Sequence, residues 1–272
     1  MKKLLKRASV KGAAKKNKYS STHKQSWGRR IFRWIRNILL FILLFPLVQV
    51  VVLKWFPVYV TPLMAIRLVE QATEGKQLKC GHYWQPLDRI SPSLVQAVVA
   101  SEDNLFMEHY GFDFEQIREA KTAAKAGKRL RGASTISQQT AKNVFLWPKR
   151  SYFRKGIEAY YTLLIELIWS KRRIMEVYLN SIETGNGIYG AEAVAQAHFR
   201  KTAAELSASE SALIAATLPN PLRFNSARPS DYVLRRRDQI LSLMGKIGQV
   251  DLDKKPENQS KPGKDKNGAN SR

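Results

Sequence analysis

The chain has 272 residues, of which 44% are hydrophobic and 10% aromatic, and this content excludes a wholly disordered protein. The formal net charge is +24, and it is uneven, because residues 1–36 hold thirteen Lys or Arg and no acidic residue. A single cysteine, Cys80, excludes an internal disulfide bond and a cysteine metal cluster.

An apolar stretch follows the basic N-terminal segment. Asn37 to Leu53 reads NILLFILLFPLVQVVVL, seventeen residues without a charge, with aromatic residues on both flanks. This length spans roughly 25 Å as a helix, near the lower limit for crossing a bilayer. We therefore predict a basic cytoplasmic tail at 1–36 and one transmembrane helix at 37–56, with the rest of the chain outside the cytoplasm. A cleaved signal peptide is less favoured, because no small-x-small cleavage site follows.

The remaining sequence predicts a mainly α-helical domain over residues 57–249. Its first part, 57–90, reads as a mixed connecting segment with short extended pieces. Residues 250–272 have almost nothing to bury and are predicted to be disordered. Helices are expected at 92–102, at 116–127, from 135 onwards, at 154–180 with a break near Lys171, at 205–218 and at 230–247.

Two adjacent acids, Glu102 and Asp103, follow the first of these helices. Ser91 followed by Pro92 is typical of a helix N-terminus, and an apolar stripe beginning at Leu94 carries Glu102 to the C-terminal end. The negative end of a helix dipole raises the pKa of a carboxyl group, which makes Glu102 a better proton acceptor. The alternative is an ordinary surface glutamate at a helix end.

A second stretch, RGASTISQQTAKN, covers residues 131–143. Ser134 and Thr135 lie where a new helix presents unpaired amides, and Thr135-x-x-Gln138 resembles a capping box. Lys142 adds positive charge, so the stretch is a candidate cradle for phosphate. A capped helix with a polar Gln face explains the same residues.

The third stretch begins at Arg154. Arg154, Lys155 and Glu158 share one helix face by their spacing. Glu158 and Glu166 lie in a segment too apolar to be all surface, so each carboxylate needs cations, a metal or a cavity nearby. An exposed Arg-Glu pair is the simpler explanation.

In this order, the stretches resemble the peptidoglycan glycosyltransferase family, in particular its monofunctional members. The resemblance covers roughly residues 85–245 and implies a lysozyme-like helical domain. It further implies that lipid II is polymerised into glycan strands. The matching segments are EDNLFMEHYGFD, RGASTISQQTAKNVFLW, RKGIEA, SKRRIMEVYLN and GNGIYGAEAVAQAHFRK.

The resemblance also assigns roles to individual residues. Glu102 is expected to be the catalytic base, and Glu158 is expected to assist it. Members of the family often use a divalent ion near the pyrophosphate, Mg²⁺ or Mn²⁺, and Glu158 would then help to hold it. The sequence itself contains no independent metal motif. The residues expected to bind substrate are Asp103, Phe106, His109, Ser134, Thr135, Gln138, Gln139, Lys142, Asn143, Arg154 and Lys155.

The chemistry agrees with these roles. A sugar hydroxyl needs a base, whereas a lipid pyrophosphate leaves already charged, so one carboxylate and a cationic clamp suffice. Displacement by the hydroxyl is expected to invert the anomeric carbon and give a β-1,4 link. No transpeptidase activity is expected, because the only S-x-x-K match, Ser21 to Lys24, lies in the tail and no K-T-G occurs.

The expected setting is a bacterial cytoplasmic (inner) membrane. The expected partners are lipid II, the growing glycan strand, membrane lipids and other cell-wall synthesis or division proteins, with no nucleic acid. Residues 114–131, including Lys125, Lys128 and Arg129, are predicted to be mobile and close to the lipid surface. Two alternatives remain: a lysozyme-like or lytic enzyme that cleaves glycan strands, and a non-enzymatic membrane scaffold of wall synthesis.

Overall fold

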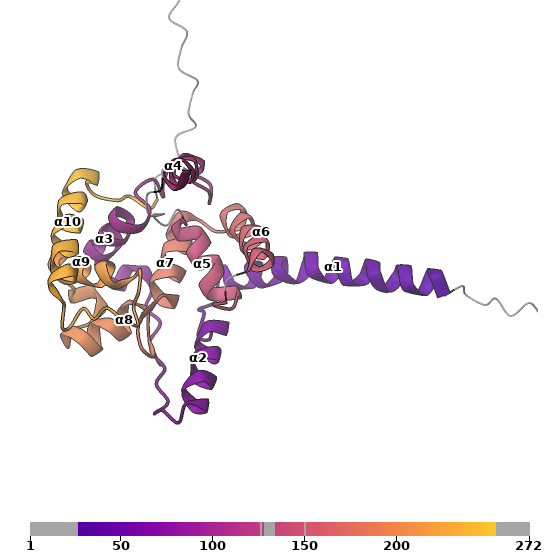
Figure 1. Ribbon diagram of the computed structural model, residues 1–272, viewed down its shortest axis with the longest axis horizontal. Helices are drawn as coiled ribbons and strands as arrows, with labels where there is room; N and C mark the ends of the chain where they lie inside the picture. The colour runs from indigo at the N-terminus through magenta and orange to yellow at the C-terminus, as the bar shows by residue number, and fades with distance from the viewer. Residues whose placement is uncertain (1–26, 126, 128–133, 150, 254–272) are drawn as a thin grey trace, which may run out of the picture. The chain divides into compact units, whose positions relative to one another are not determined.

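The computed structural model describes residues 27–125, 127, 134–149 and 151–253 (Figure 1). The described chain is mainly helical, as the sequence predicted. By its contacts the chain divides into two units, residues 1–45 and residues 46–272. Parts of the predicted tails, at residues 1–26 and 254–272, and Lys128 and Arg129 of the predicted basic loop lie outside the described residues.

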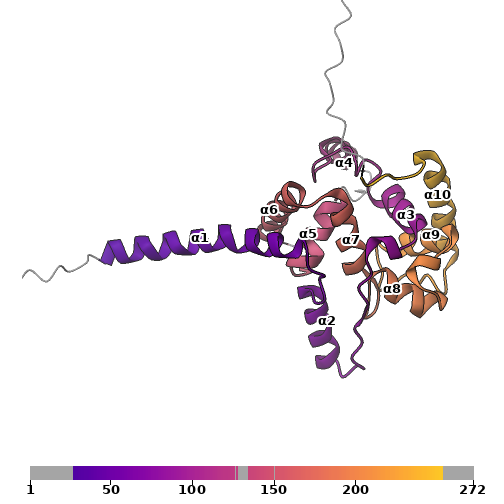
Figure 2. The ribbon, with the colours of Figure 1, turned by 180° about the vertical axis from the view of Figure 1, so that it is seen from behind.

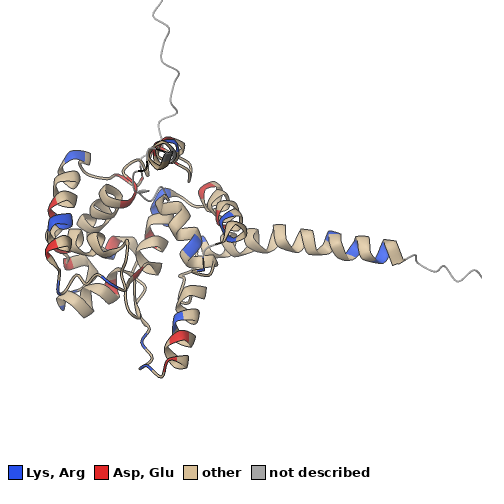
Figure 3. Cartoon of the chain, in the orientation of Figure 1, with Lys and Arg blue, Asp and Glu red and all other residues tan. Residues whose placement is uncertain are grey.

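Helix α1, Trp27–Leu53, carries the apolar stretch. Its most apolar window has a mean hydropathy of 2.3, and 11% of that window is buried. Among the described residues, α1 is the one helix long and apolar enough to cross a membrane. It begins well before residue 37, because the preceding residues alternate aromatic, aliphatic and arginine side chains and contain no proline. Figure 3 shows the Lys and Arg positions of α1 gathered towards its N-terminal end.

The last turns of α1 belong to the second unit. The indole Nε1 of Trp169 donates a hydrogen bond to the carbonyl oxygen of Val50 at 2.8 Å. The Arg173 guanidinium donates to the carbonyl oxygen of Leu53, also at 2.8 Å. These bonds satisfy carbonyl groups that the end of a helix leaves unpaired.

Residues 57–90 contain more regular structure than predicted. Helix α2, Pro62–Thr73, begins with Thr61 as N-cap, whose hydroxyl accepts from the Met64 amide at 3.2 Å. The prediction of a connecting segment was therefore wrong here, although Thr61-Pro62 is a helix-start signal. Strand β1, Gly81–His82, and the 3₁₀-helix η1, Leu87–Arg89, follow.

Helix α3, Pro92–Glu102, has the predicted bounds and packs against α9 and α10 (Figures 1 and 2). Its predicted apolar stripe is confirmed, because Leu94, Val95, Val98 and Val99 are all buried. Ser91 precedes the helix but its side chain does not cap it; the hydroxyl donates instead to the carbonyl oxygen of Leu206 at 2.8 Å. Helix α9 covers Ala208–Thr217 and α10 covers Asp231–Ile247, both close to the predicted spans.

Helices α5, α6 and α7 form the neighbouring group. Helix α5, Ile136–Phe145, opens with the predicted capping box: the Thr135 hydroxyl accepts from the Gln138 amide at 3.2 Å, and Gln138 Oε1 accepts from the Thr135 amide at 3.1 Å. Helices α6, Tyr152–Ile168, and α7, Lys171–Ser181, are separate, which confirms the break near Lys171. Helix α4, Phe114–Lys125, precedes them in the chain.

A small sheet and a short helix complete the unit. The strand order is β1-β3-β2, with β2 at Glu183–Gly185 and β3 at Ile188–Tyr189. Strand β3 pairs parallel with β1 and antiparallel with β2. Helix α8, Gly190–Val194, continues into a π-helical turn at Ala195–Phe199, and a 3₁₀-turn covers Ala203–Glu205. Strand β1 lies in the segment where short extended pieces were predicted. Strands β2 and β3 were not predicted, because strands of two or three residues are too short for an alternating pattern.

Helix α6 has one buried face and one exposed face. Tyr152, Phe153, Leu163 and Leu167 are exposed, Tyr152 by 99% and Leu167 by 72%. The helix buries Tyr161, Leu164 and Ile165 on its other side. The apolar side chains of α6 thus pack in the core on one face of the helix and are exposed on the other.

Candidate active site

Glu102 is the last residue of α3, and its carboxylate faces helix α5. Gln139 Nε2 donates a hydrogen bond to Glu102 Oε2 at 3.0 Å. Glu102 also lines a cavity of about 560 Å³, together with residues of α4 and α10 such as Glu119 and Leu243. Glu102 is therefore held by the protein on one side and accessible from a cavity on the other.

The surroundings of Glu102 set its proton affinity. Burial raises the pKa of its carboxyl group above the ordinary value. The hydrogen bond from Gln139 and the positive charges of Arg236 and Lys142 oppose this rise, whereas Asp103 adds to it. The predicted direction of the shift is confirmed, but burial rather than the helix dipole is its largest cause.

A cationic cluster lies on α6. Arg154 Nη1 donates to Glu158 Oε2 at 2.8 Å, and Lys155 Nζ donates to Glu158 Oε1 at 2.5 Å, which confirms the predicted shared face. Glu158 is 3% exposed and Arg154 is 7% exposed. Arg154 Nε is buried without a hydrogen-bond partner among the described residues. This N–H is a buried donor whose hydrogen-bonding capacity no described residue uses.

Lys142 of α5 connects the two groups. Burial lowers the pKa of its ammonium, and the like charges of Arg154 and Lys155 lower it further. Glu158 and Glu102 both act on Lys142 in the opposite direction. Lys142 therefore lies within electrostatic reach of the carboxylate at the end of α3 and of the cluster on α6.

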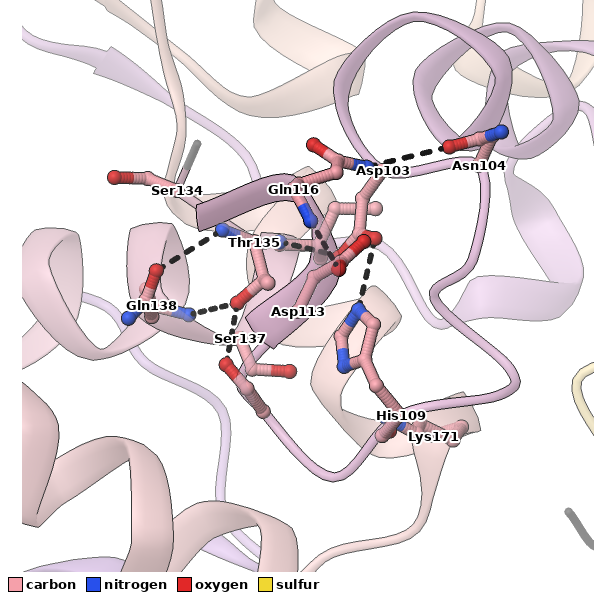
Figure 4. Close-up of polar contacts among 12 residues, drawn as sticks. Asp103, Asn104, His109, Asp113, Gln116, Ser134, Thr135, Ser137, Gln138 and Lys171 are labelled. Atoms are coloured by element: carbon pink, nitrogen blue, oxygen red, sulfur yellow. Dashed lines mark hydrogen bonds and ion pairs between the residues drawn. The ribbon is translucent and has the colours of Figure 1, made fainter. Parts of the chain in front are cut away.

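The acid beside Glu102 is buried and bonded on both carboxylate oxygens (Figure 4). Asp103 Oδ1 accepts from His109 Nε2 at 2.8 Å, and Asp103 Oδ2 accepts from the Ile136 amide at 2.9 Å. The Thr135 hydroxyl donates to the carbonyl oxygen of Gly111 at 2.7 Å. These bonds fasten the segment that follows Glu102 to the N-terminus of α5.

Several residues expected to contact substrate have internal partners instead. Asp103 and His109 bind each other, while Thr135 and Gln138 form the capping box. Phe106 is fully buried in the hydrophobic core, and Asn143 is also buried. Asp103 nevertheless lines the same cavity as Glu102, whereas Phe106 lies in the core, so contact of these residues with substrate stays a prediction. Of the remaining predicted residues, Ser134 and Lys155 are exposed, and Gln139 and Lys142 are partly exposed.

A second buried ion pair supports the same segment. Lys171 Nζ donates to Glu166 Oε1 at 2.9 Å and to the carbonyl oxygen of His109 at 2.6 Å. The ammonium also lies 4.6 Å from the ring centre of Phe106, and Ser137 donates to Glu166. Glu166 is thus paired with a buried cation, one of the partners expected from the sequence. The pair stabilises the segment next to the site and is not exposed in it.

Sequence reasoning missed Arg236, Tyr178 and Lys171. Arg236 of α10 acts electrostatically on Glu102, and its Nε is buried without a hydrogen-bond partner among the described residues. Tyr178 of α7 is fully buried and donates to Gln139 Oε1 at 3.3 Å. The Arg235-Arg236-Arg237 run was visible as a charge cluster, but only packing shows which member faces the site.

The residues suggested for a metal do not fit a resident divalent ion. Mg²⁺ and Mn²⁺ favour several oxygen ligands. Both oxygens of Glu158 are already paired with cations, and the described part of the chain contains no group of three or more His, Cys, Asp or Glu that could hold a metal.

Comparisons with known proteins show which family the chain is similar to. Residues 71–245 match the family model described as Transglycosylase. Proteins named biosynthetic peptidoglycan transglycosylase are similar over most of the chain. The one from Bacteroides thetaiotaomicron is 58% identical over 80% of this chain and 88% of its own length. The one from Caulobacter vibrioides is 50% identical over 81% and 95%, and the one from Shewanella oneidensis is 45% identical over 83% and 96%.

The family match and the shared name of these relatives place the chain in the class of glycosyl-transferring enzymes. The extent of the family match and the identities to these relatives show that the chain belongs to the transglycosylase family.

Proposed function

We propose that this protein polymerises lipid II into β-1,4-linked glycan strands, as a peptidoglycan glycosyltransferase without transpeptidase activity. The observation that carries the proposal is the match of residues 71–245 to the Transglycosylase family model. The charges around Lys142 support it, because Lys142 interacts electrostatically both with Glu102 and with the cluster of Arg154, Lys155 and Glu158. Lys142 thus links the base to the cationic cluster. This arrangement suits a reaction in which the base activates a hydroxyl of the acceptor and the cations stabilise a diphosphate leaving group of the donor.

The reaction balances with these groups alone. The oxygen of the acceptor sugar hydroxyl attacks the anomeric carbon of the donor, and Glu102 takes the hydroxyl proton. The bond between that carbon and the pyrophosphate oxygen breaks, and undecaprenyl pyrophosphate leaves with the electron pair. Attack opposite to the leaving group converts an α-linked donor into a β-linked product.

The cationic side chains stabilise the leaving group. Arg154 keeps one guanidinium arm on Glu158, which fixes its plane, and its buried Nε remains free for a phosphate oxygen. Lys142 and Lys155 add charge from α5 and α6. Glu158 acts by holding Arg154 and Lys155 in place, since both of its oxygens are engaged with them.

The requirement for a divalent ion stays a prediction. Both oxygens of Glu158 are paired with cations, so Glu158 would have to release Arg154 or Lys155 to bind a metal. Lipid II polymerisation should be compared with and without a chelator. Activity that survives chelation supports stabilisation of the leaving group by Arg154, Lys142 and Lys155 alone.

We infer that α1 anchors the protein in the cytoplasmic membrane with its N-terminus inside and the catalytic unit outside. The basic residues before and within the start of α1 support this orientation. Cys80 is the only cysteine and is exposed, so it reports the side of the membrane. A membrane-impermeant maleimide should label it in spheroplasts, whereas a Cys80→Ser, Ser21→Cys protein should be labelled only after lysis. The reverse pattern rejects the orientation.

Membrane lipids are the second proposed partner. The exposed apolar face of α6, formed by Phe153, Leu163 and Leu167, suits contact with a bilayer. Tyr110 and Phe114, near the start of α4, are exposed as well. Such contact would keep the site next to a substrate whose lipid tail stays in the membrane, so that their encounter is confined to two dimensions.

The decisive test uses the full chain with purified lipid II. Glu102→Gln should reduce polymerisation by at least ~10²-fold, the loss typical of removing a general base. Glu108→Gln is the matched control, because Glu108 lies in the same segment and is exposed. Near-normal activity of Glu102→Gln rejects the role of Glu102. Release of soluble muropeptides from sacculi, without consumption of lipid II, indicates a lytic enzyme instead.

A further inference from the structure

Gln139 joins the proposed base to a tyrosine on another helix. Its Nε2 donates to Glu102 Oε2 at 3.0 Å and to the carbonyl oxygen of Ser134 at 3.3 Å. Its Oε1 accepts from the hydroxyl of Tyr178 at 3.3 Å. Three elements therefore meet at one amide: the end of α3, the start of α5 and the middle of α7.

The two ends of the amide are not equivalent. An ionised carboxylate only accepts hydrogen bonds, so Glu102 needs the NH₂ end of Gln139 towards it. With that end engaged, Oε1 points into the protein and requires a donor. Tyr178 supplies it from a position with no exposed surface. Without the hydroxyl, Oε1 would be a buried polar atom without a hydrogen-bond partner. The orientation of the amide that places its NH₂ group on Glu102 would then be less stable.

The tyrosine is suited to be a permanent donor. Burial raises the pKa of its hydroxyl well above the ordinary value, and the negative charges of Glu102 and Asp103 raise it further. The hydroxyl therefore keeps its proton wherever Glu102 is ionised. Helix α7 holds it in the core, where Ile174, Met175 and Val177 are also fully buried.

We propose that Tyr178 is a positioning residue for the proposed glycosyl transfer, which fixes the Gln139 amide so that Glu102 stays oriented and readily ionised. The inference rests on the proposed function of Glu102. Tyr178 touches neither reacting group, and its effect passes through Gln139.

Other charged groups also face Glu102 and must be kept constant in a test. Arg236 acts on it from α10, Lys142 from α5 and Asp103 from the next position in the chain. Glu115 and Glu119 of α4 line the same cavity. Substitution of Tyr178 by phenylalanine changes none of these charges, so a change in pH dependence reports the hydrogen-bond chain.

The experiment compares the wild type with Tyr178→Phe in lipid II polymerisation as a function of pH. Loss of one hydrogen bond is expected to lower kcat by about three- to tenfold. KM should change little, and the acid limb of the kcat profile should move to higher pH, because the hydrogen bond from Gln139 lowers the pKa of Glu102. Tyr189→Phe is the control, since the Tyr189 hydroxyl is buried without a hydrogen-bond partner among the described residues.

A double-mutant cycle separates this role from a general effect on stability. In a Gln139→Ala protein, Tyr178→Phe should produce no further loss of kcat, because the connection is already broken. Additive losses overturn the proposal. An unchanged acid limb in Gln139→Ala overturns it as well, whether or not Tyr178→Phe folds. If Glu102→Gln remains active, the proposed function itself fails, and that result does not depend on Tyr178.

Discussion

The carboxylate of Asp103 accepts a hydrogen bond from the backbone amide of Ile136 at 2.9 Å. The residue next to the proposed base thus binds the first residue of α5, the helix that carries Gln139 and Lys142. A carboxylate at a helix N-terminus is favourable both as a hydrogen-bond acceptor and as a negative charge. One buried contact therefore fastens the residue beside the base to the helix that carries Gln139 and Lys142.

Removal of this contact should weaken the fold and the site together. Asp103→Ala leaves the Ile136 amide and His109 Nε2 without their acceptor, at a cost of about 1–3 kcal/mol. The melting temperature should fall by roughly 2–4 °C per kcal/mol for a unit of this size. Glu108→Ala, an exposed change in the same segment, should melt like the wild type. Equal melting temperatures for the two variants contradict the capping role.

Gly111 should not tolerate a side chain. Its φ is +80°, and a Cβ there would lie 2.8 Å from Thr162 Cγ2 and 2.9 Å from Glu166 Cγ. Gly111→Ala is therefore expected to reduce thermal stability and to displace the Asp103 to Asp113 segment from α6. Gly245→Ala in α10 meets nothing within 4 Å and should stabilise the helix by about 0.5–1 kcal/mol. Calorimetry should show a lower melting temperature for Gly111→Ala and a higher one for Gly245→Ala than for the wild type.

Removing only one partner of the buried Lys171–Glu166 ion pair should strongly lower the free energy of unfolding. Lys171→Met leaves the Glu166 carboxylate buried with only Ser137 and removes the bond to the His109 carbonyl oxygen. The expected loss of unfolding free energy is about 3–5 kcal/mol. Arg118→Met breaks an exposed pair and should cost under about 1 kcal/mol.

The doubly substituted protein gives the sharper result. Lys171→Met with Glu166→Gln removes the uncompensated charge as well, so part of the stability should return relative to Lys171→Met alone. Urea unfolding of the three proteins measures this difference. A double variant that is less stable than the single one would mean that Glu166 has another cationic partner.

The pH dependence of activity should be bell-shaped. Glu102 must be ionised to accept a proton, so activity is lost as pH falls through its raised pKa. Lys142 must be charged to hold a phosphate, and because its pKa is lowered, activity should fall at a lower pH than for an ordinary lysine. Arg236→Met should move the acid limb to higher pH, since the Arg236 charge lowers the pKa of Glu102. Arg235→Met, an exposed change on the same helix, should leave the profile in place.

The raised pKa of Glu102 also has a consequence for stability. The folded protein holds the Glu102 proton more tightly than the unfolded chain does, so this group lowers stability as pH rises through that pKa. Glu102→Gln should therefore melt at a higher temperature than the wild type at neutral pH. The gap should narrow as the pH is lowered, and a gap that widens instead contradicts the assigned shift.

Local sequence patterns were sufficient to predict most of the long helices. The apolar stripe from Leu94, the Thr135 to Gln138 capping box and the break before Lys171 each depend on residues close together in the chain. Helix α2 and the short strands β2 and β3 were missed. A helix-start signal was present for α2, whereas the strands depend on pairing partners far away in the sequence.

The sequence alone determined the apolar anchor segment, the unequal charge and the types of group at the site, because these follow from composition and from spacing along one helix. Tertiary structure alone decided which of those groups face the cavity. It buried Phe106 in the core, and it brought Arg236 and Tyr178 to the base from helices distant in the chain. Burial and hydrogen-bond direction arise only when helices pack, and both shift the pKa of the base.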